Sequence, residues 1–281
     1  MGHRRGAELV IRVARRYFGD NVGNEAAALS YYLIFSLFPL MVFGSSLLGF
    51  ANISQEMLYE SLHGILPEEM IDMIAAYVAY ATSGTSTNLL MVSLFFTFYF
   101  PYRAMSRVIR AINFAYRVER DRSVISKVIL VFVFSLFLVA LLFGTLVLTV
   151  MGRKILTLVA RYIPITQGFI DLWAPLRFLI LAVLTFLVVL FLYVMAPNCK
   201  VRLREVLPGA LFTMVLWLAF SIGFSYYVEH VAYYSVVFGS LGAMIIMLIW
   251  LYAVAVILIL GAELNSVLRG MGYFQKRAKQ E

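Results

Sequence analysis

The sequence is poor in charged residues and holds a single cysteine. Only 14% of its 281 residues are charged and 63% are hydrophobic, whereas a soluble domain has about 25% charged and about 45–50% apolar residues. This composition excludes a soluble globular domain and indicates an integral membrane protein. Because Cys199 has no second cysteine to pair with, a disulfide within the chain is also excluded.

Residue patterns that form metal and catalytic sites are scarce as well. The three histidines, His3, His63 and His230, lie far apart, and no H-x-x-x-H or C-x-x-C spacing is present. We therefore expect no metal site and no cofactor. The sequence also has no Walker A motif and no G-x-S-x-G motif, which argues against an ATP-driven pump and against a recognisable nuclease or protease. We expect that the protein is not an enzyme.

Long charge-free apolar stretches are abundant instead. A helix needs about 20 apolar residues to cross the hydrocarbon core of a bilayer. We predict an all-α integral membrane fold with six transmembrane helices, at about 26–50, 88–110, 124–150, 172–196, 206–228 and 240–268. The first apolar run is too long and continuous for the core of a cleavable signal peptide, so none is expected.

The basic residues predict the orientation of these helices. Most of them lie before the first helix, near the second and third, between the fourth and fifth, or after the sixth. All but four of the 23 lysines and arginines belong to these flanks, the exceptions being Arg153, Lys154, Arg161 and Arg177. Because basic flanks face the cytoplasm, we predict that both termini are cytoplasmic.

Amphipathic and basic segments flank the predicted membrane domain of residues 26–268. Residues 1–25 place apolar side chains on one helical face and arginines on another, which predicts a basic helix on the inner surface. The outer connections, at about 55–83 and 151–171, are predicted to form short amphipathic interfacial helices. Residues 269–281 are predicted to be a basic cytoplasmic tail.

The first predicted helix carries polar groups on one side. Glu25, Tyr32, Ser36 and Pro39 are spaced so that they share a helical stripe. Pro39 also leaves a backbone carbonyl without its helical partner. A polar side chain in lipid needs a protein, water or headgroup partner. The stripe is therefore expected to face the helix bundle, as a packed and hydrogen-bonded contact or as the wall of a cavity.

The last predicted helix has a similar stripe. Tyr252 and Glu263 fall on one face, together with Ser266. Glu263 lies near the inner end of the helix, and the glycine-rich stretch "VVFGSLGAM" at the entry permits close helix approach.

The second predicted helix ends in a basic stripe. Arg103, Arg107 and Arg110 lie on or near one face and are expected at the inner surface. They are either anchors that contact anionic headgroups or ion-pair partners of Glu25 and Glu263 across the bundle. The two glutamates are otherwise plain surface residues at the inner interface.

Four stretches resemble a known family. They are "NEAAALSYYLIFSLFPL", "RAINFAYRVERDR", "LYVMAPNCKVRLREVLPGA" and "YSVVFGSLGAMIIMLIWLYAVAVILILGAELN". In this order they are similar to the YihY/BrkB family of bacterial inner-membrane proteins. The resemblance implies a multi-pass protein of the bacterial cytoplasmic membrane. Family names have included a serum-resistance virulence factor and ribonuclease BN, the latter regarded as a misassignment, and some members look like transporters of lipids, envelope precursors or small solutes. No established catalytic residues carry over.

These observations favour a membrane transporter or flippase-like exporter without ATP chemistry. Its substrate pathway or gate would use the residues of the three polar stripes. Membrane lipids are the expected partners, anionic headgroups at the inner face above all, and a homo-oligomer is left open. The alternative is a non-transporting membrane scaffold for envelope assembly. A nuclease is disfavoured and no nucleic-acid partner is expected, because the formal net charge of +8 follows from the basic inner flanks.

Overall fold

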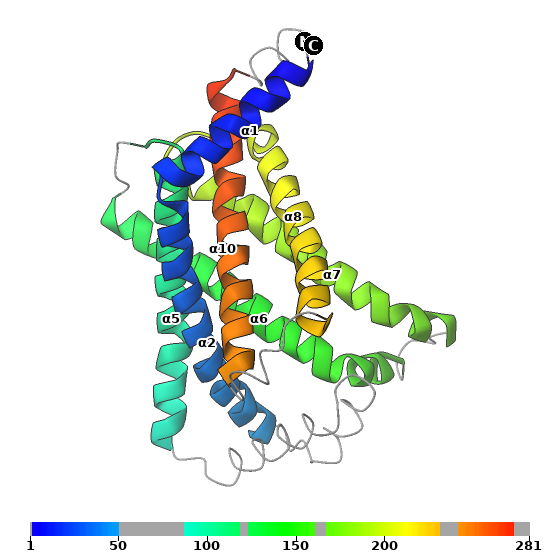
Figure 1. The fold of residues 1–281 in the computed structure, drawn as a ribbon. Coiled ribbons are helices and arrows are strands. Elements are labelled where there is room, and N and C mark those ends of the chain that lie inside the picture. The colour runs from blue at the N-terminus through cyan, green and yellow to red at the C-terminus, as the bar shows by residue number, and fades with distance from the viewer. Residues whose placement is uncertain (1, 51–86, 119–122, 161–166, 231–240, 273–281) are drawn as a thin grey trace. The chain divides into compact units, whose positions relative to one another are not determined.

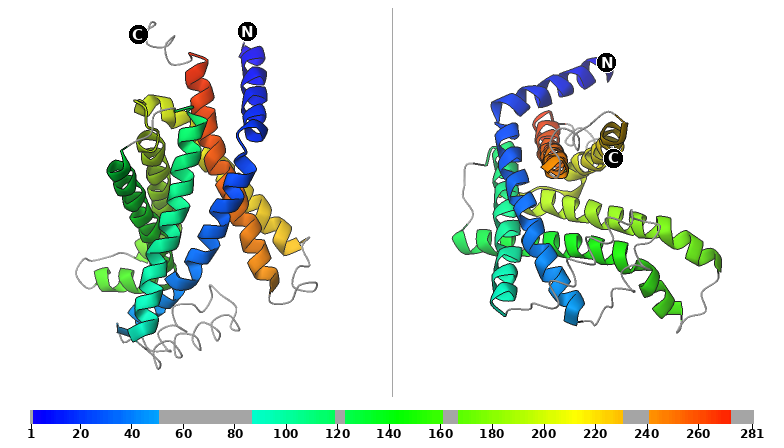
Figure 2. Two further views of the ribbon diagram at one scale, coloured as in Figure 1. Left: turned by 90° about the vertical axis from the view of Figure 1, so that its left-hand side faces the viewer. Right: turned by 60° about the horizontal axis from the view of Figure 1, so that its bottom comes forward.

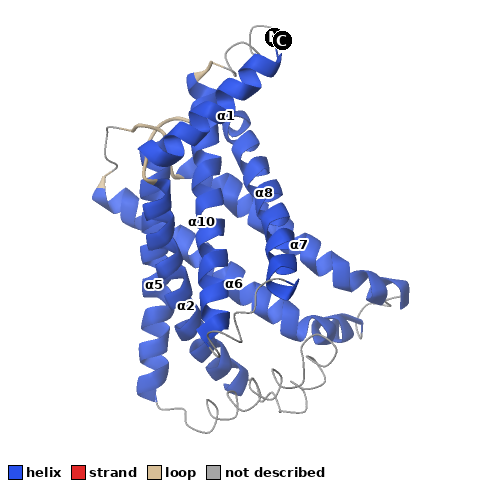
Figure 3. Cartoon of the chain, viewed as in Figure 1, coloured by secondary structure: helices blue, strands red, loops and turns tan. Residues whose placement is uncertain are grey.

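A computed structural model describes residues 2–50, 87–118, 123–160, 167–230 and 241–272. Within these ranges every regular element is an α-helix (Figure 3). The helices are α1 (Gly2–Gly19), α2 (Val22–Phe50), α5 (Thr87–Ala115), α6 (Val124–Ala160), α7 (Gln167–Met195), α8 (Leu203–His230) and α10 (Leu241–Gly270) (Figure 1). The predicted all-α fold is confirmed for this part of the chain.

Several of these helices are apolar enough to cross a membrane. Among the described residues, three segments have the length and composition of a span: Val124–Leu142, Leu203–Val228 and Met244–Gly270. Leu179–Met195 is a shorter apolar segment of the same kind. The long helices from α2 to α10 fall over the six predicted ranges. The membrane character of the protein is thus confirmed, while the number of spans stays a prediction.

The structure describes only part of the two predicted interfacial segments. The segment at about 55–83 lies outside the described residues, and so do residues 161–166. Up to that point α6 continues as one helix to Ala160. No proline interrupts it before Pro164, so the start of the predicted segment at 151–171 extends α6.

The chain forms two compact units, and the first comprises residues 1–35, 101–135 and 186–281. It contains α1, α8 and α10 together with one end each of α2, α5, α6 and α7. Both α1 and α8 pack against α10 (Figures 1 and 2). Its most deeply buried apolar side chains are Val22, Ala26, Leu29, Val108, Ile112, Val131, Phe134, Tyr193 and Val206.

The contact between α8 and α10 depends on two glycines. A Cβ atom on Gly261 would collide with the hydroxyl groups of Thr213 and Tyr193. A Cβ atom on Gly209 would collide with the Gly261 carbonyl and with the side chain of Asn265. Small residues let membrane helices approach closely. We call the set of Gly209, Thr213, Gly261 and Asn265 the α8–α10 seam.

The second unit comprises residues 36–100 and 136–185. In it, α2 continues as a helix through Pro39. On α5, Ser93 and Thr97 are buried and lie four residues apart, so they share one face of the helix. Polar side chains therefore lie in the interior of this unit as well.

Candidate functional site

A tight turn between α1 and α2 buries an acidic side chain. The Asp20 amide donates a hydrogen bond to the Arg16 carbonyl over 2.8 Å. Asn21 then adopts the left-handed conformation, with φ of 52°, which asparagine tolerates better than most residues. Its carbonyl accepts hydrogen bonds from the amides of Asn24 and Glu25 as α2 begins. The Asp20 side chain is left only 2% exposed.

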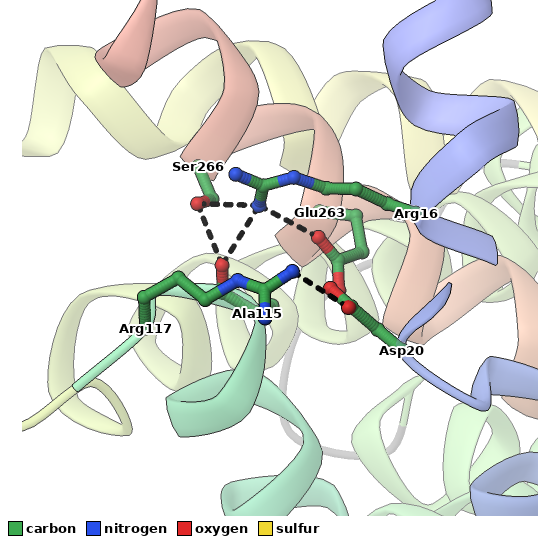
Figure 4. A network of polar contacts seen from close by, with 6 residues as sticks. All are labelled: Arg16, Asp20, Ala115, Arg117, Glu263 and Ser266. Atoms are coloured by element: carbon green, nitrogen blue, oxygen red, sulfur yellow. Dashed lines mark hydrogen bonds and ion pairs between the residues drawn. The ribbon is translucent and has the colours of Figure 1, made fainter. Parts of the chain in front are cut away.

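Arg16 links α1 to the ends of two other helices. One of its terminal nitrogens, Nη1, lies 2.9 Å from Glu263 Oε2, from Ser266 Oγ and from the Ala115 carbonyl (Figure 4). Ser266 Oγ also donates to that carbonyl over 2.7 Å. Ala115 is the last residue of α5, and its carbonyl has no partner within the helix. A cation at this position also suits the negative end of the helix dipole.

Arg117 holds the other carboxylate. Its Nη2 lies 2.7 Å from Asp20 Oδ1 (Figure 4). Arg117 follows the end of α5 and has a φ of 53°, a strained conformation for a residue other than glycine or asparagine. The positive φ of Arg117 and its ion pair with Asp20 together fix the end of α5 against the α1–α2 turn.

These four residues form what we call the Arg–carboxylate cluster: Arg16, Asp20, Arg117 and Glu263. The carboxyl groups of Asp20 and Glu263 lie against each other. Asp20 Oδ2 is buried and has no hydrogen-bond donor within the described part of the chain. Adjacent carboxylates repel, and a nearby arginine offsets that repulsion. The two arginines thus balance the two carboxylates, and loss of one cation would leave a buried negative charge.

A cavity of about 360 Å³ adjoins the cluster. It lies between α1, the turn that follows α5 and the end of α10. Its lining residues are Arg12, Arg15, Arg16, Gly19, Asp20, Arg117, Val267 and Gly270. We call it the arginine cavity. Basic side chains from α1 and from the turn after α5 surround one cavity, which can hold an anion.

The predicted basic stripe on α5 is used in three different ways. Arg107 forms an ion pair with Glu25 on α2, with their charged atoms 3.6 Å apart. An ion pair with Glu25 is one of the two alternatives that the sequence leaves open for these arginines. Arg103 donates a hydrogen bond to the Tyr32 hydroxyl over 3.1 Å, and its guanidinium lies 5.4 Å from the centre of that ring. Arg110 is exposed. The stripe therefore tethers α5 to α2.

Glu263 is neither a surface residue nor a partner of the α5 stripe. Its side chain is 1% exposed, and its ion-pair partner is Arg16 on α1. The expected pairing with Arg103, Arg107 or Arg110 is therefore wrong for this glutamate. Arg16, just before the α1–α2 turn, lies beside the end of α10. Arg103 and Arg107 on α5 instead contact α2.

The other predicted residues of the polar stripes are separated. The Tyr252 hydroxyl lies beside the Tyr17 hydroxyl and faces Gly23 at the start of α2. Ser36 is buried and Pro39 is half-buried, and both belong to the second unit. The lining of the arginine cavity contains neither tyrosine of the stripes, Tyr32 or Tyr252, and not Ser36.

An asparagine at the end of α5 makes a second connection within the first unit. Asn113 Nδ2 donates to the carbonyls of Ile109 and Ala196, over 2.8 and 2.9 Å. Its Oδ1 accepts from the Asn198 amide over 2.8 Å. One side chain thereby fixes the turn between α7 and α8 to α5.

Sequence reasoning missed Arg16, Asp20 and Arg117 as site residues. The signal for Asp20 is local: an Asp–Asn pair after a basic amphipathic helix is typical of a turn that ends a helix. Arg16 and Arg117 carry no such signal, because each is one of many arginines on the basic flanks. In the ranges that the structure describes, no three histidine, cysteine or acidic side chains gather as a metal site would require.

Comparison with known proteins gives a consistent result. Residues 13–281 match the family model described as "Virulence factor BrkB". The chain is 31% identical over 257 residues to the "Putative ribonuclease-like protein YfkH" of Bacillus subtilis (strain 168), covering 90% of this chain and 92% of the relative. It is 29% identical to a "UPF0761 membrane protein" of Alkalilimnicola ehrlichii, covering 95% of this chain but 59% of the relative. A "UPF0761 membrane protein" of Coxiella burnetii (strain Dugway 5J108-111) is 27% identical, with 94% of each chain covered. No solved structure matches the chain.

Proposed function

The chain belongs to the virulence factor BrkB family of membrane proteins, and from its buried charges we propose that it is a transporter or flippase-like exporter that works without ATP. The cargo is an anionic amphiphile, such as a lipid or an envelope precursor, or a small solute. We further propose six spans with both termini in the cytoplasm and a location in the bacterial inner membrane.

The ion pair between Arg16 and Glu263 carries this proposal. Glu263 lies in the apolar segment Met244–Gly270 and is 1% exposed. A charged group within a membrane helix is costly, and such groups mark substrate or ion pathways. Replacing a buried ion pair with apolar side chains is often neutral or stabilising. Packing alone therefore does not require a carboxylate at this position.

The arrangement suits a gate that an anion opens. A phosphate binds an arginine with charge-assisted hydrogen bonds of the same kind as those made by a carboxylate. A phosphate that reaches Arg16 would compete with Glu263 and Ser266 for its donors. Release of Glu263 would then loosen the contact of α10 with α1, while the hydrogen bond from Ser266 to the Ala115 carbonyl still joins α10 to the end of α5.

The polar stripes extend this pathway in the proposal. Glu25 and Arg107 form a second carboxylate–arginine pair, between α2 and α5. Tyr32 and Arg103 contact each other about two turns further along α2. We assign these four residues, with Arg110, Tyr252, Ser36 and Pro39, to the route that the cargo follows.

A membrane scaffold remains the second candidate, and the α8–α10 seam favours it. Asn265 accepts a hydrogen bond from the Gly209 amide over 2.7 Å and donates to the Val206 carbonyl over 3.0 Å. Tyr193 is fully buried and contacts Thr213 with its hydroxyl. This seam is packed and holds its polar groups in satisfied hydrogen bonds, as a scaffold requires.

Reconstitution distinguishes the two candidates. The purified protein is placed in liposomes that contain labelled phosphatidylglycerol or labelled phosphatidylcholine, and movement between leaflets is followed by quenching of the outer label. A transporter gives protein-dependent movement of the anionic lipid, and parallel liposomes loaded with a labelled polyol test for small solutes. If the protein moves none of these probes, the scaffold is the better description.

A further inference from the structure

The arginine cavity has a strong excess of positive charge. Four arginines and one acidic residue, Asp20, line it. Asp20 is already paired with Arg117 at 2.7 Å. Arg16 is paired with Glu263, which does not itself line the cavity. The volume of about 360 Å³ falls within the range of about 300–1,000 Å³ that is usual for small-molecule sites.

Two of these arginines have donors to offer. Arg15 is exposed, and within the described residues no ion pair or hydrogen bond connects it to another side chain. Arg12 pairs with Glu8 at 2.6 Å, but both side chains are about half exposed, and such surface pairs contribute little. An incoming anion therefore meets one unpaired guanidinium and one that exchanges its partner at low cost.

From this geometry we propose that the arginine cavity is a binding site for a phosphate group. Guanidinium groups present a planar fork of donors that matches phosphate oxygens, and two arginines can engage one phosphate at the same time. Arg12 and Arg15 are the primary contacts, and Arg117 is within the same lining. Arg16 forms the inner wall, where the site meets the Arg–carboxylate cluster.

A lipid headgroup is the favoured source of this phosphate. Val10, Ala14 and Phe18 lie four residues apart and form one stripe on α1. Val10 is 67% exposed and Phe18 is 80% exposed, so the stripe is apolar and uncovered within the described part of the chain. A helix with an apolar stripe beside arginines lies in the membrane interface. That placement brings the arginines to the depth of the phosphates.

The site deepens the proposed function and rests on it in one respect. The role of the cavity as the entry point of a transported lipid depends on transport. Binding of a phosphate to the cavity does not, because it needs only the geometry of the lining. Binding and transport are therefore measured separately.

The test uses the full-length protein in detergent and two probes. Short-chain phosphatidic acid and inorganic phosphate are titrated into the wild type, Arg15→Gln and Arg202→Gln, and heat is recorded by calorimetry. Arg202 is the matched control, because it is an exposed arginine that does not line the cavity and is not assigned to the route of the cargo. Both substitutions remove one surface charge, and the melting temperature of each variant verifies its fold.

We expect the wild type to bind phosphatidic acid and Arg15→Gln to bind it at least tenfold more weakly, with Arg202→Gln unchanged. Tighter binding of the lipid than of inorganic phosphate supports the headgroup assignment. Equal binding of both probes supports a phosphate site and overturns the lipid source. The proposal is overturned if the wild type binds neither probe, or if the two variants weaken binding equally. If Arg15→Gln loses binding but moves lipid normally in liposomes, the cavity binds phosphate but is not part of the transport route.

Discussion

Arg16 on α1 lies 2.9 Å from Glu263 on α10, although 247 residues separate them in the sequence. This contact holds α1 against the C-terminal part of α10, an apolar helix. It also positions Arg16 to cap α5 through the Ala115 carbonyl. Three helices thus depend on one guanidinium.

Substitution of Arg16 is expected to destabilise the protein. Arg16→Gln removes the cation from Glu263, and loss of one partner of a buried pair costs about 3–5 kcal/mol. Arg16 is 24% exposed, so we expect a smaller loss than this range, about 2–3 kcal/mol. The melting temperature in detergent should fall by several degrees. Arg12→Gln removes a more exposed arginine of the same helix and should change it little. Equal shifts in both variants would contradict the structural role of Arg16.

The pair between Glu25 and Arg107 should behave differently. Its charged atoms are 3.6 Å apart, and its side chains are 27% and 32% exposed. Such an accessible pair is worth about 1 kcal/mol or less. Glu25→Gln should therefore leave the melting temperature close to that of the wild type. A loss as large as that of Arg16→Gln would show that this pair is buried in the membrane-embedded protein.

The fold and the site differ in how far sequence predicted them. The helices followed from long apolar runs, because hydrophobicity is a property of each segment alone. The shared face of Glu263 and Ser266 followed from helical spacing, and both now contact Arg16. The partner itself did not follow. Many arginines flank the predicted helices, and helical periodicity does not say which one returns to α10.

The missing information lies in two backbone positions. Asn21 and Arg117 both adopt positive φ, at 52° and 53°. These residues set the directions in which the chain leaves α1 and α5, and hence where Asp20 meets Arg117. Asparagine at such a position is common, whereas arginine is not. A sequence pattern therefore predicts the turn at Asn21 but does not predict the turn at Arg117.

The α8–α10 seam predicts a strong effect of adding one methyl group. Gly261→Ala places a Cβ atom against Thr213 and Tyr193, and overpacking of this kind costs about 1–3 kcal/mol. Gly223→Ala is the matched control on α8, because nothing lies within 4 Å of its Cβ position. There alanine should be neutral or stabilising, by up to about 1 kcal/mol. Thermal unfolding of both variants measures the difference, and equal stability would contradict the close packing.

Asn113 is expected to be the most sensitive uncharged polar residue at the end of α5. Asn113→Ala removes hydrogen bonds to the Ala196 carbonyl and from the Asn198 amide. Buried groups left unpaired cost about 1–3 kcal/mol. Asn24→Ala changes an exposed asparagine and should stay within about 0.5 kcal/mol of the wild type. Protease digestion between α7 and α8 should be faster in the first variant only. Unchanged digestion would mean that the turn is held by other contacts.

The most direct test of the account is lipid movement by Glu263→Gln in liposomes. Glutamine keeps a carbonyl oxygen for Arg16 but removes the charge, so the protein should fold and be incorporated normally. Movement of labelled phosphatidylglycerol is expected to fall at least tenfold, which corresponds to about 1.4 kcal/mol or more. Glu8→Gln, which removes an exposed carboxylate from α1, should keep the wild-type rate. Wild-type movement by a well-folded Glu263→Gln variant would contradict the claim that the Arg16–Glu263 pair is the gate.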